Sequence, residues 1–77
     1  MVEAYILVQT EVGRAAEVAS RIAEIEGVRQ AEDVTGPYDV IVRAYADDID
    51  SLGRLVVARI QRLEGIARTL TCPIVKI

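Results

Sequence analysis

The residues best suited to recognition chemistry lie in one short segment, Thr35-Gly36-Pro37-Tyr38-Asp39, which precedes an aliphatic run. Gly36 permits the positive φ that a tight turn between two strands can require. Asp39 stands just inside the aliphatic run, where an unpaired carboxylate costs free energy. A backbone N–H group of another turn, an arginine or the ammonium group of a small ligand would each satisfy it. An ordinary hairpin turn is the alternative interpretation of the segment.

Two threonines in the last apolar segment, Thr69 and Thr71, offer hydroxyl groups that can donate and accept hydrogen bonds. Their spacing of two places both side chains on the same side of a strand. Ordinary β-propensity is the competing explanation for them. Cys72 stands beside Pro73 with no base near it in the sequence, so we expect it to be a packing residue.

Catalytic and metal-binding residue types are scarce in the 77 residues. The chain has no histidine and one cysteine, which argues against zinc sites, internal disulfides and histidine-based catalysis. Neither Ser20 nor Ser51 has a histidine to activate it, and no glycine-rich phosphate loop is present. The adjacent acids Asp47-Asp48 and Glu32-Asp33 point apart in a strand or a turn. We therefore expect no catalytic residue, no metal and no cofactor.

Composition and charge restrict the classes of partner. Nine basic and twelve acidic residues give a net charge of −3, and the basic residues are spread evenly along the chain. Nucleic-acid binders concentrate positive charge and often stack bases on aromatic rings, so we expect no direct nucleic-acid binding. No apolar run approaches the roughly 20 residues that span a bilayer, and the first residues lack a basic signal region. We expect one soluble cytoplasmic domain over residues 1–77.

Hydrophobic patterning divides the chain into six elements. Residues 2–9, 28–35, 40–45 and 66–77 are predicted strands, and residues 15–25 and 49–63 are predicted helices. Asp47 or Asp48 can cap the second helix, and Gly27 and Gly65 follow the two helices as stop signals. The second helix carries an apolar stripe of Ile49, Leu52, Val56, Ile60 and Leu63.

The order strand-helix-strand-strand-helix-strand predicts an α+β fold of the ferredoxin-like βαββαβ type. Right-handed crossovers then place both helices on one face of a four-stranded antiparallel sheet, with the first and third strands at its centre. The polar strand 28–35 is expected near an edge of this sheet.

The other face of the predicted sheet is unusually apolar. Strand alternation gathers Tyr5, Leu7, Ile41 and Tyr45 on this face, and Ala67, Thr69 and Thr71 can lie alongside. A contiguous patch of this kind exceeds what a soluble monomer usually exposes, and a core of this size barely offsets the chain entropy. We expect Tyr5, Leu7, Ile41 and Tyr45 to form the interface of a homodimer with an α/β sandwich architecture. A half-hydrated sheet face is the alternative.

The segment Gly36-x-Tyr38-Asp39 followed by Val40-Ile41-Val42, together with Arg68-Thr69-Leu70-Thr71, resembles the effector-binding (RAM) domain of the Lrp/AsnC feast/famine regulators. The resemblance covers essentially the whole chain. It implies a regulatory, ligand-binding domain whose dimers assemble into an octamer or a decamer and bind amino acids in clefts between dimers. It further implies that Gly36, Tyr38 and Asp39 line that cleft, with Asp39 available to an amino group, and that Thr69 and Thr71 supply hydroxyl groups.

Members of this family usually begin with a helix-turn-helix, and none precedes Val2. We therefore expect either a stand-alone effector domain or a domain excised from a longer chain. Such a domain would sense an amino acid and modulate transcription indirectly, by assembling with full-length Lrp/AsnC regulators. One alternative is a small dimeric α+β-barrel enzyme, which needs an internal cavity opening on Tyr5 or Tyr45. The other is a purely structural assembly module that forms rings regardless of ligand.

Overall fold

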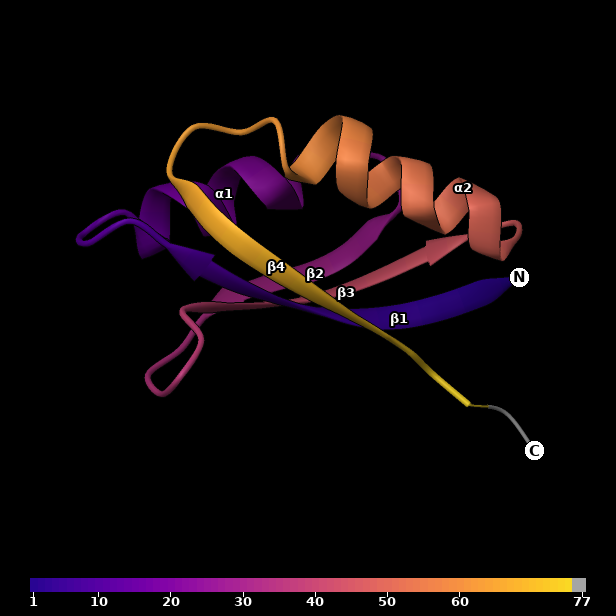
Figure 1. Cartoon of the computed structure of the whole chain (residues 1–77), viewed down its shortest axis with the longest axis horizontal. Helices are drawn as coiled ribbons and strands as arrows, with labels where there is room; N and C mark the ends of the chain where they lie inside the picture. The colour runs from indigo at the N-terminus through magenta and orange to yellow at the C-terminus, as the bar shows by residue number, and fades with distance from the viewer. Residues whose placement is uncertain (76–77) are drawn as a thin grey trace.

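A computed structural model describes residues 1–75, which follow the predicted βαββαβ order (Figure 1). The strands are β1 (Val2–Thr10), β2 (Val28–Asp33), β3 (Val40–Ala46) and β4 (Ile66–Pro73). The first helix is α1 (Ala15–Ala23); the second consists of α2 (Ile49–Arg54) and the π-helix η1 (Leu55–Ile60), which follows it directly. The last two residues of the predicted strand 66–77 lie outside the described residues.

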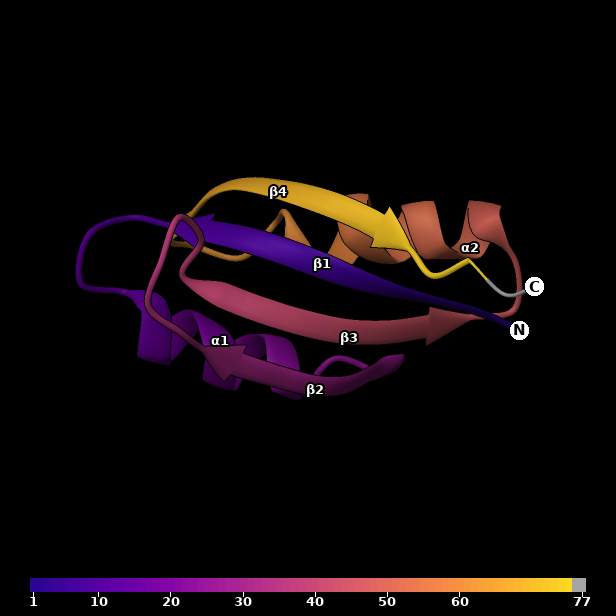
Figure 2. The same cartoon turned by 90° about the horizontal axis from the view of Figure 1, so that it is seen from below.

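The sheet has the predicted topology. Its strand order is β2-β3-β1-β4, every neighbouring pair is antiparallel, and β1 and β3 are central. Both helices lie on the same side of the sheet (Figure 1). Seen from below, α1 lies toward the β2 edge and α2 toward the β4 edge, and the near face of the sheet carries no helix (Figure 2). The ferredoxin-like fold is confirmed.

An aliphatic core fills the space between the sheet and the helices. The alternation of β1 and β3 sends one side chain in two toward the helices, and the helices present residues at spacings of three and four. Fully burying one such valine, leucine or isoleucine stabilises the fold by about 1.5–3 kcal/mol. The core consists of Ala4, Ile6, Val8, Val18, Ala19, Ile22, Ile25, Val40, Val42, Ala44, Leu52, Val56 and Ile60.

The second helix departs from the predicted uninterrupted α-helix. In η1 the backbone hydrogen bonds join residues five positions apart instead of four. The N–H of Gln61, for example, donates to the carbonyl oxygen of Val56 at 2.8 Å. A four-residue spacing overshoots one α-helical turn, and the wider π turn removes that overshoot. Leu52, Val56 and Ile60 therefore stay in line against the sheet, while Ile49, predicted in the same stripe, is 55% exposed.

The helix boundaries follow the predicted start and stop residues. Of the two candidate caps, Asp48 begins α2, because its side chain accepts a hydrogen bond from the N–H of Ser51 at 2.7 Å. This bond holds the pKa of Asp48 below its usual value. Gly27 and Gly65 adopt φ of 98° and 94° after the two helices, so the same device recurs in both halves of the chain.

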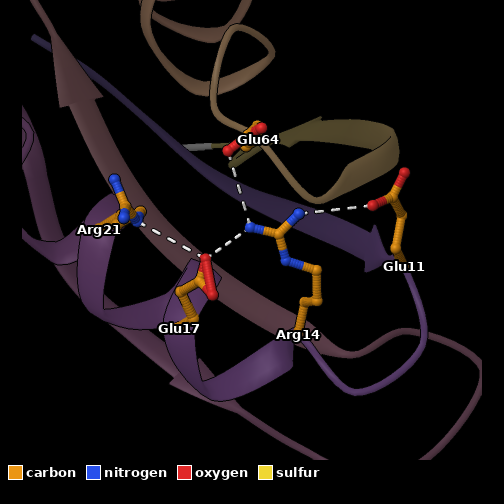
Figure 3. Close-up of polar contacts among 5 residues, drawn as sticks. All are labelled: Glu11, Arg14, Glu17, Arg21 and Glu64. Atoms are coloured by element: carbon orange, nitrogen blue, oxygen red, sulfur yellow. Dashed lines mark hydrogen bonds and ion pairs between the residues drawn. The ribbon is translucent and has the colours of Figure 1, made fainter.

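Arg14 joins the start of α1 to two loops (Figure 3). Its guanidinium lies 2.6 Å from Glu17, 3.5 Å from Glu11 and 4.0 Å from Glu64. The hydrogen bond to Glu17 raises the pKa of Arg14 and lowers that of Glu17. Beside this cluster, the N–H of Glu11 donates to the carbonyl oxygen of Gly65 at 2.8 Å. The loop after β1 and the loop before β4 are thereby held together.

No helix in the described part of the chain is long and apolar enough to cross a membrane.

Candidate functional site

The carboxylate of Asp39 ties the β2–β3 hairpin to the end of β1. The N–H of Thr10 donates to Oδ2 of Asp39 at 2.8 Å, and the Thr10 hydroxyl donates to the same oxygen at 3.3 Å. The N–H of Asp39 in turn donates to the carbonyl oxygen of Val8 at 2.9 Å. Of the three partners considered from the sequence, the structure therefore supplies the backbone N–H group.

The loop before Asp39 is held by further hydrogen bonds. Gly36 adopts the positive φ that the sequence predicts, 140°. The side-chain amide of Gln9 donates to the carbonyl oxygen of Pro37 at 3.0 Å, and the N–H of Val34 donates to that of Asp39 at 2.8 Å. Tyr38 is half-buried beside them. These contacts give Gly36, Tyr38 and Asp39 one defined arrangement on the end of the sheet.

Thr69 and Thr71 lie on the helix-covered side of the sheet. They pair with Val8 and Ile6, whose side chains belong to the core, and residues paired across antiparallel strands point to the same face. The expectation that they lie alongside Leu7 and the tyrosines is therefore wrong. A shift of one residue in register reverses every side chain of a strand, and patterning alone did not determine the register of β4.

Both threonines line an open groove between β4 and the second helix, with a volume of about 350 Å³. The side-chain amide of Gln61 donates to the Thr69 hydroxyl at 2.7 Å within it. Among residues 1–75, no charged side chain lines this groove. Its lining consists of Ile49, Leu52, Gly53, Val56, Val57, Gln61, Thr69, Thr71 and Pro73.

The five predicted ligand residues form two separate groups in one chain. The strand β1 runs between them, because Val8 accepts a hydrogen bond from Asp39 and pairs with Thr69 on its other side. Two strand spacings amount to about 10 Å. The two groups also differ in their surroundings. The hairpin group lies in a loop at one end of the sheet, and the threonines lie on the face that the second helix covers.

The uncovered face carries a row of aliphatic side chains across three strands. Leu7 pairs with Ile41 on one side and with Leu70 on the other. Leu70, 47% exposed, was not predicted from the sequence to belong to this face. Its position between Thr69 and Thr71, which sends its side chain to the opposite face from theirs, was the available signal. Cys72, expected to be a packing residue, is exposed on this face opposite Tyr5 and is not packed within one chain.

One end of the same face is aromatic and charged. Glu3 lies 3.4 Å from Arg29 and 3.3 Å from Arg43. The Arg29 guanidinium lies 4.4 Å from the centre of the Tyr45 ring, and that of Arg43 lies 5.4 Å from the Tyr5 ring. Arginine over an aromatic face is a favourable arrangement. All four predicted interface residues, including both tyrosines, thus lie on the uncovered face.

A second open depression of about 320 Å³ lies beside Tyr45 at the surface. The enzyme alternative required an internal cavity at one of the tyrosines, and this depression is open. Ser51 in its lining accepts a hydrogen bond from the Arg54 guanidinium at 3.2 Å. Within residues 1–75, no group of three histidine, cysteine or acidic side chains is placed to hold a metal ion.

Comparison with known proteins identifies the family. The family model of the Lrp/AsnC ligand-binding domain matches residues 3–77. The chain belongs to this family. The resemblance seen in the Gly36-x-Tyr38-Asp39 segment is thereby confirmed at the level of the family.

Curated relatives carry this domain type within longer chains. The uncharacterized HTH-type transcriptional regulator PH1916 of Pyrococcus horikoshii is 33% identical over 55 residues, which are 71% of this chain and 37% of the regulator. A homocitrate synthase of Sulfolobus acidocaldarius is 37% identical over 59 residues, 77% of this chain but 12% of the synthase. The chain thus spans little more than a third of the regulator and a small part of the enzyme.

Solved structures share the fold over the whole chain. TTHA0845 from Thermus thermophilus is 31% identical with a TM-score of 0.93, covering 100% of this chain and 96% of its own. The transcriptional regulator NMB0573 of Neisseria meningitidis, solved as an L-Met complex, is 19% identical with a TM-score of 0.85. That match covers 97% of this Lrp/AsnC domain and 50% of the regulator.

Proposed function

We propose that this Lrp/AsnC domain senses an amino acid that binds where copies of the chain meet. The observation that carries the proposal is the division of the ligand residues into two groups on opposite sides of β1. The hairpin group supplies a carboxylate, and the threonine group lines a neutral groove. A cleft that combines the hairpin of one copy with the groove of another would offer an amino acid both.

Asp39 is suited to an ammonium group although it is already hydrogen-bonded. A carboxylate has about four lone-pair sites on its two oxygens, and the Thr10 contacts both use Oδ2. Those contacts also fix the orientation of the carboxylate, which reduces the entropy lost when a ligand binds. Gly36 and Tyr38 would form the wall of the cleft beside it.

The uncovered sheet face is proposed as the dimer interface. Its aliphatic row of Leu7, Ile41 and Leu70, flanked by Tyr5 and Tyr45, has the apolar centre and the enrichment in tyrosine and arginine that interfaces show. Two copies packed through this face would form the α/β sandwich that the sequence predicts. Such dimers would assemble further into a ring, an octamer or a decamer, and thereby create the clefts.

Sensing follows from linkage between ligand and assembly. An amino acid that contacts two dimers at once binds only the assembled form and therefore stabilises it. The domain would act in the cytoplasm by changing its own assembly or its association with full-length Lrp/AsnC regulators. We propose this indirect action in place of direct DNA contact, because basic residues are dispersed along the chain.

The relatives support a sensor more than an enzyme. The matched segment is similar to part of an HTH-type transcriptional regulator and to 12% of a homocitrate synthase. A domain found beside such different partners is better explained by ligand recognition than by a shared reaction. The L-Met complex of the Neisseria regulator supports an amino acid as the effector class.

The decisive experiment measures assembly and binding together. The mass of the assembly and its Tm are determined with and without each of the twenty amino acids, followed by isothermal titration of those that respond. A ligand present at 100 times its Kd should add about 2.7 kcal/mol of stability. A ring that forms and remains indifferent to every amino acid would instead support the structural assembly module.

A further inference from the structure

The two signs of charge are distributed differently along the chain. The basic residues are dispersed, but eleven of the twelve acidic residues lie in residues 1–50. Glu64 is the single acidic residue after position 50, and its carboxylate lies 4.0 Å from Arg14. The first two thirds of the chain are therefore acidic and the last third is basic.

Ion pairing within the chain follows the same division. Each of the four arginines in residues 1–50 forms an ion pair with a glutamate. None of the arginines at positions 51–75 forms an ion pair with another described residue. In the segment from α1 to the end of β2, four acidic side chains likewise have no ion pair or hydrogen bond within residues 1–75: Glu24, Glu26, Glu32 and Asp33.

The topology carries these unpaired charges to opposite edges of the sheet. The edge strands are β2 and β4, with α1 beside the first and the second helix beside the other (Figure 2). We call the four acidic residues just named the acidic edge. The basic edge consists of Arg54 and Arg59 on the second helix and Arg68 on β4. The side chains of both edges are exposed.

Solubility and helix capping do not explain this separation. A surface that only keeps a protein soluble has both signs of charge interspersed. The dipole of the second helix favours an arginine in its last turn, such as Arg59, but does not act on Arg68 in β4. A nucleic acid would be attracted to the basic edge and repelled by the rest of a chain whose net charge is −3. A second copy of the chain offers the complement of each edge.

We propose that the acidic edge of one copy docks on the basic edge of a copy in the neighbouring dimer. The inference rests on the proposed function, because it names the contact by which dimers assemble. A contact between two different surfaces joins copies head to tail and closes into a ring where the rotation allows it. Exposed ion pairs are individually weak, so the charges decide which edges meet and how fast they associate.

The two edges also adjoin the two groups of proposed ligand residues. Asp33 ends β2, directly before the loop that carries Gly36 and Asp39. On the basic edge, Arg68 precedes Thr69 in β4. Docking of the two edges therefore brings the hairpin group of one copy toward the threonine group of another. This is the arrangement that the proposed amino-acid cleft requires, so the same contact links assembly to binding.

Reversal of the charges on one edge tests the contact. Arg54→Glu/Arg59→Glu makes the basic edge acidic, and Glu24→Arg/Asp33→Arg makes the acidic edge basic. In either variant, like charges meet at every junction between dimers. Light scattering of the full chain, with each amino acid that responds, should show the mass of a dimer, about fourfold below an octamer or fivefold below a decamer. The circular dichroism spectrum should be unchanged, because all four positions are exposed.

The matched control combines both reversals in one chain. This variant has the native net charge and complementary edges of exchanged sign, so it should recover the native mass. Glu32 and Arg68 remain unchanged in all variants, because their pairing with Ile41 and Gln9 places them on the uncovered face, the proposed dimer interface. In about 1 M sodium chloride the Debye length is about 3 Å, and the native and combined chains should both dissociate toward dimers.

The possible outcomes separate this inference from the proposed function. Native mass in both single-edge variants overturns the inference, as does a combined variant that fails to reassemble; the proposed function stands in either case if an amino acid binds. Duplex DNA that binds the native chain but not Arg54→Glu/Arg59→Glu, with the mass unchanged, would assign the basic edge to a nucleic acid instead. A native chain that stays dimeric with every amino acid overturns the proposed assembly, and this inference with it.

Discussion

The N–H of Thr10 donates a hydrogen bond to Oδ2 of Asp39 at 2.8 Å, joining the end of β1 to the hairpin between β2 and β3. The two residues are 29 positions apart, so this bond is a tertiary contact. It gives Asp39 a structural role in the fold beside the role proposed for it in binding. Substitutions at Asp39 can separate the two roles, because one depends on an acceptor oxygen and the other on a negative charge.

Asp39→Asn should keep the fold and lose the ligand response. The asparagine side-chain oxygen still accepts from Thr10 but has no charge for an ammonium group. Asp39→Ala removes the acceptor as well and should lower the free energy of unfolding by about 1–3 kcal/mol. Isothermal titration measures the loss of binding and urea denaturation the loss of stability. Native ligand affinity in the Asn variant would show that the charge has no part in binding.

Ile41→Asp should separate the proposed dimers. Ile41 lies at one end of the aliphatic row and is already 37% exposed within one chain, so the fold tolerates the change. A two-fold interface would bury two carboxylates, one from each copy, and loss of a hot-spot contact costs about 2 kcal/mol or more. Light scattering should show a smaller assembly.

The control for this substitution is Val12→Asp, which likewise replaces an aliphatic residue with aspartate, at a fully exposed loop position. It should leave the mass of the assembly unchanged. If Ile41→Asp retains the native mass while Val12→Asp does too, the uncovered face is not the interface.

Alanine at two helix-associated glycines should have opposite effects. Gly65 has φ of 94°, and a Cβ there would lie 3.1 Å from both Arg14 and Val18. Gly65→Ala should therefore destabilise the chain by about 1–2 kcal/mol. Gly53→Ala gains helix propensity without a clash and should stabilise it by up to about 1 kcal/mol. Urea midpoints measure both, and a shift of the same sign in the two variants would contradict the assigned conformations.

The Arg14 cluster should make stability depend on pH in the acid range. Arg14 lowers the pKa of Glu17, so Glu17 stabilises the fold above its unfolded pKa of about 4.3. That contribution is lost as the pH falls through the lower pKa of the folded chain. In Arg14→Gln this part of the stability lost in acid should disappear. The Tm of the variant should therefore fall less than that of the native chain between about pH 7 and pH 3. Arg62→Gln, an equal change of charge at an exposed position, should keep the native pH profile.

Local signals account for the parts of the fold that the sequence predicted. The aliphatic run Val40-Ile41-Val42 indicated a central strand, and β3 is central. Asp48 begins α2, and Gly65 follows the second helix with positive φ. Each of these depends on side chains and backbone conformations within a few residues. Alternation also placed the four aromatic and aliphatic residues, Tyr5 among them, on one face.

The candidate site was predicted less completely because its parts meet through pairing between distant segments. Thr69 and Thr71 were identified as polar groups, yet their face depends on the register between β4 and β1. The groove beside them also depends on the π-helix η1, whose backbone hydrogen bonding no sequence pattern indicated. Arg29 reaches the uncovered face at a register shift between β2 and β3, which is likewise a matter of pairing.

The sequence by itself determined the order of the elements, their approximate ends, the sheet topology and the family to which the segment around Tyr38 and Asp39 pointed. Hydrophobic periodicity, capping residues and turn glycines are local signals that span only a few residues. They can therefore be recognised without knowledge of the rest of the fold. Only the tertiary structure decided which hydrogen bond satisfies Asp39 and which face carries Thr69. Both outcomes depend on strand register. A shift of β4 by one residue, which local propensity scarcely disfavours, would have placed Thr69 on the other face.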